Sequence, residues 1–151
     1  MKPRPAAILL IASLGALSLQ AQSNKVIDEM LAQPQATYAH SAYMALVGGS
    51  WIDESATPDE AFALAQQKNW IPGNAVPTDP IELGRFSVLA MRGLRIKGGV
   101  GWTLFHSKRY AVRELIARGV ANASGGQNRI PSGEEAIRMI GKMSSLTGAP
   151  K

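Results

Sequence analysis

The clearest pattern of apolar and polar positions lies in the stretch Pro77–Leu94. Apolar residues recur there at steps of three and four, the spacing of one buried face of an α-helix. Asp79 is a preferred N-cap residue, Pro80 suits a first helical turn, and Glu82 follows the cap by three positions. The stretch therefore predicts an amphipathic helix that starts near Asp79. Its core-facing residues would be Leu83, Phe86, Leu89, Ala90 and Leu94.

Similar start signals stand before two other amphipathic segments. Thr57 precedes Pro58-Asp59-Glu60, and Ser132 precedes Gly133-Glu134-Glu135. Further helices are predicted over residues 24–33, 36–47 and 107–118, each followed by proline or glycine. The expected fold class is therefore mainly α.

The period changes between residues 95 and 106. Ile96, Val100, Trp102 and Leu104 alternate there with small or polar residues, which is typical of a short strand. Three glycines in the same stretch make it pliable, and they lack the Lys-Ser/Thr ending of a phosphate-binding loop. We expect a small irregular or β insertion near residues 96–105.

The first residues have the pattern of a secretory signal peptide. Lys2 and Arg4 precede an apolar run from Ala6 to Leu19, and small residues follow at positions 21–23. We expect residues 1–23 to be a signal peptide, residues 24–147 a single helical domain and residues 148–151 a tail. An N-terminal membrane anchor or a buried helix remains an alternative. No second run of spanning length follows, so we expect an exported protein of the periplasm or cell envelope, and the absence of cysteine means that it has no disulfides.

Two predicted helical hairpins, at about residues 58–94 and 107–144, align as a weak internal repeat. Each has a helix, a short hydrophobic connector, a loop and a capped second helix. Chance similarity of two hairpins is the alternative explanation. The alignment pairs Ala61, Ala65, Trp70, Pro77, Glu82 and Phe86 with Ala111, Leu115, Val120, Pro131, Glu135 and Met139.

This layout resembles the S-layer homology (SLH) module, a helix–loop–helix unit of bacterial cell-envelope proteins. The family's connector Gly-Ile-Ile-x-Gly, loop ending Pro-x-x-Pro and helix start Ile-Thr-Arg-Ala-Glu-Phe are similar to Asn69–Gly73, Pro77–Pro80 and Ile81–Phe86. The resemblance implies a duplicated helix–loop–helix bundle. The family's Thr-Arg-Ala-Glu, linked to binding of secondary cell-wall polymers, is replaced by Glu82–Arg85 and Glu135–Arg138, so the scaffold carries over more readily than the binding. The chain is also similar to small exported proteins of spirochaete-type bacteria.

Charge is unevenly distributed along the chain. Residues 24–84 carry two cationic and eight acidic side chains, a net charge of −6, whereas residues 85–129 carry nine cationic side chains against Glu114 alone, a net charge of +8. This asymmetry indicates a basic surface for an anionic polymer or membrane headgroups. The alternative is that the two halves neutralise each other within the fold. The candidate anion- or partner-binding residues are Arg85, Arg92, Lys108, Arg109 and Arg113.

Residue types that carry catalysis or bind metals are sparse. There is no cysteine and no Gly-x-Ser-x-Gly motif, and His40 and His106 lack the spacing of a zinc-binding helix. We expect no catalytic residue, no cofactor and no metal. One acidic cluster, near Trp51, leaves a glycan-acting enzyme open because glycosidases use paired carboxylates. Its members, Asp53, Glu54, Asp59 and Glu60, also suit an exposed loop and a helix cap.

These patterns favour a non-enzymatic structural or binding module of the periplasm or cell envelope that engages an anionic envelope polymer. An accessory subunit that docks an envelope protein is the first alternative, and a small glycan-acting enzyme is the second. Nucleic acid is not an expected partner of an exported protein. The sequence predicts no oligomeric state.

Overall fold

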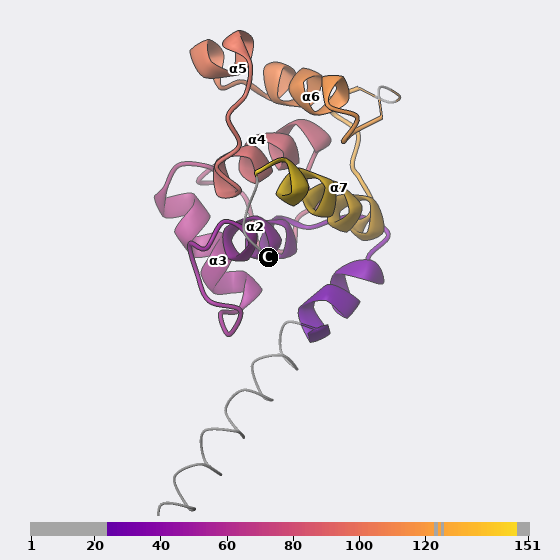
Figure 1. The fold of residues 1–151 in the computed structure, drawn as a ribbon. Coiled ribbons are helices and arrows are strands. Elements are labelled where there is room, and N and C mark those ends of the chain that lie inside the picture. The colour runs from indigo at the N-terminus through magenta and orange to yellow at the C-terminus, as the bar shows by residue number, and fades with distance from the viewer. Residues whose placement is uncertain (1–23, 123, 125, 148–151) are drawn as a thin grey trace, which may run out of the picture.

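The computed structural model describes residues 24–122, 124 and 126–147 (Figure 1). This part is mainly α, as the sequence predicts. The expected signal peptide and the tail lie outside the described residues. Among the helices that the structure describes, none is both long and apolar enough to cross a bilayer. A helical segment at residues 24–31 is followed by α2 (Tyr38–Gly48), α3 (Pro58–Gln67), α4 (Leu83–Gly93), α5 (Val100–Phe105), α6 (Lys108–Ala117) and α7 (Gly133–Leu146).

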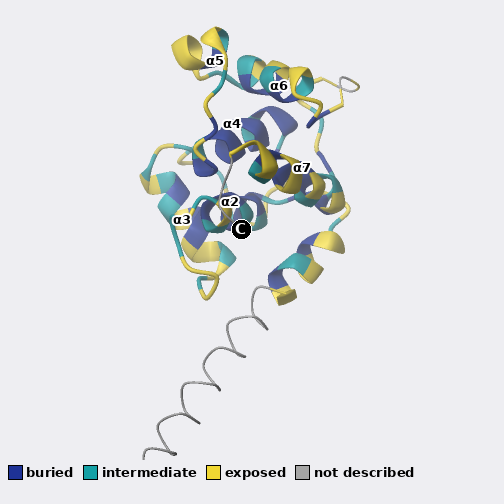
Figure 2. Ribbon diagram, viewed as in Figure 1, coloured by how far each residue is buried: buried dark blue, intermediate teal, exposed yellow. Residues whose placement is uncertain are grey.

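Helices α2, α4 and α7 enclose the core (Figure 2). Helix α3 packs on α2, and α6 packs on α4. The predicted apolar stripe of α4 is buried along its whole length, and it meets large buried side chains of the neighbouring helices. Burial of such side chains is the main force that stabilises a domain without disulfides. The largest buried side chains include Tyr43, Leu46, Phe86, Leu89, Met139 and Met143.

Two of the three predicted helix starts are confirmed. The Thr57 hydroxyl accepts a hydrogen bond from the Glu60 amide, and the Glu60 carboxylate accepts one from the Thr57 amide at 2.7 Å. The Ser132 hydroxyl accepts from the Glu135 amide. These caps satisfy amide groups that a helix end otherwise leaves without partners.

The predicted start of α4 is wrong by three to four residues. The helix begins at Leu83 with Glu82 as its N-cap, and Asp79 forms a turn in which its carboxylate accepts from the Val76 amide at 3.0 Å. Ile81 remains extended because its amide donates to the Ala36 carbonyl at 2.8 Å. A contact across 45 positions of sequence thus delays the helix.

The helices form three helix–loop–helix units, at residues 24–48, 58–93 and 108–146, one more than the sequence repeat predicts. The second helices, α2, α4 and α7, begin side by side around a ring of backbone hydrogen bonds. Ile81 donates to Ala36, and Ala36 donates to Pro131, each at 2.8 Å. Because Pro131 has no amide hydrogen, it cannot continue this pattern of donors.

The ring continues in the first turns of the three helices. The Tyr38 amide of α2 donates to the Asp79 carbonyl, the Leu83 amide of α4 donates to Arg129, and the Gly133 amide of α7 donates to Gln33. The loop of the second unit therefore caps α2 of the first unit. The loop of the third unit caps α4, and the loop of the first unit caps α7. This geometry makes Glu82 and Ser132 equivalent N-caps, so the sequence alignment of Glu82 with Glu135 is wrong by three residues.

The insertion near residues 96–105, predicted to be irregular or β, contains no strand in the described structure. Residues 96–99 are irregular, and α5 occupies Val100–Phe105. The four apolar residues of the alternating pattern do not share one buried face. Ile96 and Trp102 are buried, whereas Val100 and Leu104 are exposed. The absence of a side chain at Gly98 allows the Trp102 ring to lie over the backbone, since a Cβ atom there would be 2.4 Å from the ring.

Candidate functional site

Three of the five predicted binding residues lie in one pocket of about 530 Å³. Arg85 and Arg92 reach it from α4, because seven positions correspond to two helical turns. Lys108 reaches it from the first residue of α6. The opposite wall is the connector after α3, residues 69–73, so the pocket lies between the second unit and the start of the third.

The position of Lys108 depends on Gly84. A Cβ atom at residue 84 would lie 2.9 Å from the Lys108 Cβ and 3.1 Å from the Gln127 carbonyl oxygen. The missing side chain thus lets α6 and the third loop approach the start of α4. Lys108 also donates to the Glu82 carboxylate at 2.8 Å, and both side chains are partly exposed. This ion pair is a link between the acidic and the basic halves of the chain.

The pocket has an excess of positive charge. None of its described lining residues is acidic, and Arg85 makes no hydrogen bond or ion pair with the residues that the structure describes. Arg92 donates to the Asn69 carbonyl at 3.3 Å, and burial lowers the pKa of its guanidinium below the usual value. A guanidinium nevertheless remains charged at neutral pH. Arg92 is therefore a partly buried cation that lacks a counter-ion within the described structure.

Arg109 and Arg113 do not join this pocket. They lie on the exposed face of α6 around a smaller pocket of about 350 Å³ with Val112 and Gln127. Neither makes an ion pair within the described part of the chain. The single basic surface expected from the sequence is thus divided in two. Other basic residues are engaged in the fold: Arg95 lies over the Trp51 ring at 4.3 Å, Arg118 pairs with Glu114, and Arg129 pairs with Glu135.

The third unit has a pocket in the corresponding place, between its connector and α7. Its volume is about 440 Å³, and its lining includes Arg138 and Lys142. Unlike the pocket beside α4, it contains a carboxylate, because Glu135 lines it and accepts two hydrogen bonds from Arg129. The positive charge of Arg129 is therefore balanced there.

The acidic cluster near Trp51 lacks the features of a glycosidase site. Asp53 and Glu54 are exposed, and Asp59 lies in the exposed first turn of α3. Hydrogen bonds from the Thr57 backbone and side chain lower the pKa of Glu60. The general acid of a glycosidase needs a shift in the opposite direction.

The two histidines have structural neighbours. His40 contacts Gln33 and Thr37 through its Nδ1 atom, each at 3.1 Å, and so joins the first loop to α2. The His106 ring lies 5.0 Å from the Trp102 ring. Among the described residues, no cluster of histidine, cysteine, aspartate and glutamate has the geometry to bind a metal.

Sequence reasoning missed several residues of the basic pocket. His106 and Ser107 line it from the turn before α6, and Asn69 lines it from the end of α3. Asn69 has a positive φ of 56°, the left-handed conformation that asparagine tolerates at a helix end. The helix-end signal was therefore readable, but its proximity to Arg92 depends on the packing of three helices. No protein family model, curated protein or solved structure matches this chain.

Proposed function

We propose that this protein is an exported, non-enzymatic module of the cell envelope that binds an anionic envelope polymer in the pocket beside α4. The observation that carries this proposal is the presence in one pocket of Arg85 and Arg92, neither of which forms an ion pair within the described structure. Carboxylate or phosphate groups of a polymer would be the counter-ions of Arg85 and Arg92. Hydrogen bonds between charged groups are about twice as strong as neutral ones, and guanidinium groups bind both kinds of anion in a bidentate manner.

An SLH-like scaffold is part of the same proposal. The helix–loop–helix units, their proline-containing loops and the Ser132 cap of α7 support it. The polymer-linked positions of the family are not retained as Thr-Arg-Ala-Glu, since the second unit has Glu82, Leu83, Gly84 and Arg85 there. In this proposal Arg85 supplies the anion-binding group from its own position on α4.

The test compares two double variants with equal changes in charge. Arg85→Gln with Arg92→Gln alters the pocket, whereas Arg109→Gln with Arg113→Gln alters the exposed face of α6. Retention on purified sacculi that carry their anionic polymers is measured by co-sedimentation. The protein is isolated from the envelope fraction, and its intact mass also tests whether residues 1–23 are removed.

Retention should fall by about tenfold or more for the pocket variant, because each lost charged hydrogen bond contributes about 1.5–3 kcal/mol. The α6 variant should retain most of its binding to sacculi. After acid extraction of the anionic polymers, retention of the wild type should fall, and it should then differ little from retention of the pocket variant. Equal retention of the two variants, at equal melting temperatures, would contradict the proposal.

A further inference from the structure

Helix α5 exposes an apolar surface at the edge of the molecule. Within the described residues, the three most exposed large apolar side chains are Val100, Leu104 and Phe105, with 76%, 68% and 62% of their surfaces accessible. Figure 1 shows α5 beside α6 and far from α2 and α3, and Figure 2 shows its exposure. Such a concentration of exposed apolar side chains on a single helix marks an interaction surface.

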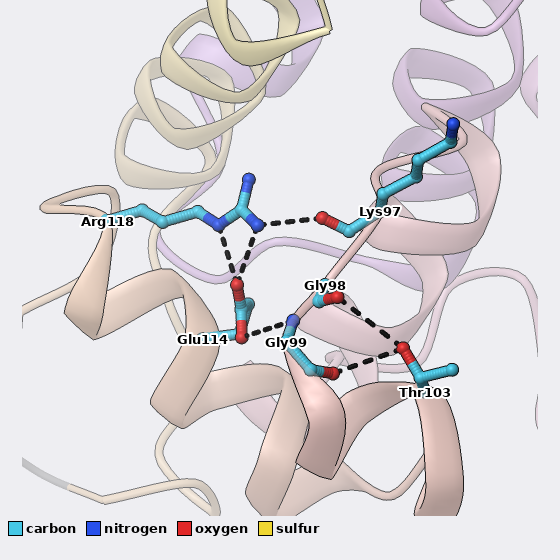
Figure 3. A network of polar contacts seen from close by, with 6 residues as sticks. All are labelled: Lys97, Gly98, Gly99, Thr103, Glu114 and Arg118. Atoms are coloured by element: carbon cyan, nitrogen blue, oxygen red, sulfur yellow. Dashed lines mark hydrogen bonds and ion pairs between the residues drawn. The ribbon is translucent and has the colours of Figure 1, made fainter.

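A network of polar contacts holds α5 in this position (Figure 3). The Gly99 amide, just before the helix, donates to the Glu114 carboxylate of α6 at 3.0 Å. Arg118 donates both to Glu114 and to the Lys97 carbonyl, each at 2.7 Å. Trp102 is buried on the opposite face of α5. The outward direction of the apolar side chains is therefore fixed by the fold.

Cationic residues precede α5 in the chain and lie on the neighbouring helix α6. The Phe105 ring stacks on the Tyr110 ring of α6, with centroids 5.0 Å apart. Arg109 and Arg113 lie one turn apart on the exposed face of α6, and Lys97 is exposed before α5. Glu114, the only acidic residue between positions 85 and 129, is already bound to Gly99 and Arg118. The surface thus combines apolar side chains with unpaired positive charge.

We propose that α5 and the exposed face of α6 dock the protein on an anionic lipid bilayer. Val100, Leu104 and Phe105 enter the boundary between headgroups and acyl chains, and Arg109 and Arg113 contact headgroup phosphates. Peripheral membrane proteins use this combination, because apolar burial and electrostatic attraction both contribute to binding. This surface is separate from the polymer pocket.

The absence of cysteine allows a direct test. An environment-sensitive fluorophore is attached to Leu104→Cys on α5 and, as a matched control, to Val76→Cys, which lies in an exposed loop of the second unit. Both are mixed with vesicles of phosphatidylglycerol and phosphatidylethanolamine, and with vesicles of phosphatidylcholine alone. We expect a blue-shifted, brighter emission at position 104 only, and only with the anionic vesicles.

Binding by co-sedimentation with the same vesicles completes the test. Leu104→Ser with Phe105→Ser should weaken binding by about tenfold or more, the loss expected from removing two apolar side chains from the membrane boundary. Leu31→Ser with Val76→Ser removes exposed apolar side chains elsewhere and should bind as wild type does. Arg109→Gln with Arg113→Gln should weaken vesicle binding, whereas the pocket variant Arg85→Gln with Arg92→Gln should not.

Several results would overturn the proposal. One is equal vesicle binding by the α5 variant and the wild type. Another is an equal emission shift at positions 104 and 76. A third is binding to neutral vesicles as strong as binding to anionic vesicles. Self-association that the α5 variant abolishes, without any vesicle binding, would assign the surface to a second copy of the chain. These results leave sacculus binding through Arg85 and Arg92 untouched, so the two proposals fail independently.

Discussion

Replacement of Gly133 by alanine should destabilise the protein, although alanine is the better helix former. Gly133 is the first residue of α7, and its amide donates to the Gln33 carbonyl of the first loop. A Cβ atom at this position would lie 1.7 Å from the Met30 carbonyl oxygen and 3.3 Å from the Gln33 Cβ. The obstacle is a backbone carbonyl, which cannot rotate away as a flexible side chain would. The first loop and the start of α7 would have to separate.

The size of the effect follows from two opposing terms. Overpacking a close contact typically costs about 1–3 kcal/mol, and a backbone obstacle places the cost at the upper end. The helix preference of alanine offsets at most about 1 kcal/mol. We expect a net loss of about 2 kcal/mol, which corresponds to roughly 6–8 °C in melting temperature for a domain of this size.

Gly141 provides a matched control in the same helix. It is exposed, and a Cβ atom there would meet nothing within 4 Å. Gly141→Ala should therefore stabilise the protein by about 0.5–1 kcal/mol. Urea unfolding followed by far-ultraviolet circular dichroism measures both variants. If Gly133→Ala is as stable as Gly141→Ala, the first loop does not lie against α7, and the ring of capping loops is wrong.

Two further predictions concern the core and an ion pair. Phe86→Ala should lower the free energy of unfolding by about 3–5 kcal/mol because Phe86 is fully buried. Arg85→Ala should change it by no more than about 0.5 kcal/mol. Similar urea midpoints for the two variants would contradict the packing of α4. Hydrogen bonds from Arg129 lower the pKa of Glu135 below its ordinary 4.5. A carboxyl group whose pKa is lower in the folded than in the unfolded state stabilises the fold at pH values above its unfolded-state pKa. This stabilisation is lost as the pH falls through the folded-state pKa. Glu135→Gln should therefore flatten the stability profile below about pH 4.5, and an unchanged acid slope would contradict this role of Arg129.

Local signals in the sequence predicted much of the helical structure. The Thr57 and Ser132 caps and the apolar stripe from Leu83 to Leu94 lie within single segments, and each depends on neighbours three or four positions away. Gly119, with a positive φ of 68°, ends its helix as glycine after a helix commonly does. Such features are determined by the chain's immediate chemistry.

Features that depend on distant contacts were not predictable in the same way. Asp79 and Pro80 favour a helix start by themselves, but the hydrogen bond from Ile81 to Ala36 keeps that segment extended. The grouping of the basic residues in space also depends on distant contacts. Arg85 and Arg92 share a pocket with Lys108 because α6 packs on α4, and the phase of α6 turns Arg109 and Arg113 away from it. Helical spacing places residues on a face, but it does not determine which faces meet.

The closed ring of capping loops has a consequence for folding. In a linear array of repeats, a unit contacts only its neighbours, so folding can begin anywhere and stop part-way. Here Gln33 in the first unit caps Gly133 in the last, one hundred positions later. Removal of any one unit would leave another helix start without its partner carbonyls. The chain is therefore expected to fold in one cooperative transition, at a rate limited by the entropy of closing its longest loop, and its units should not be separable as independent domains.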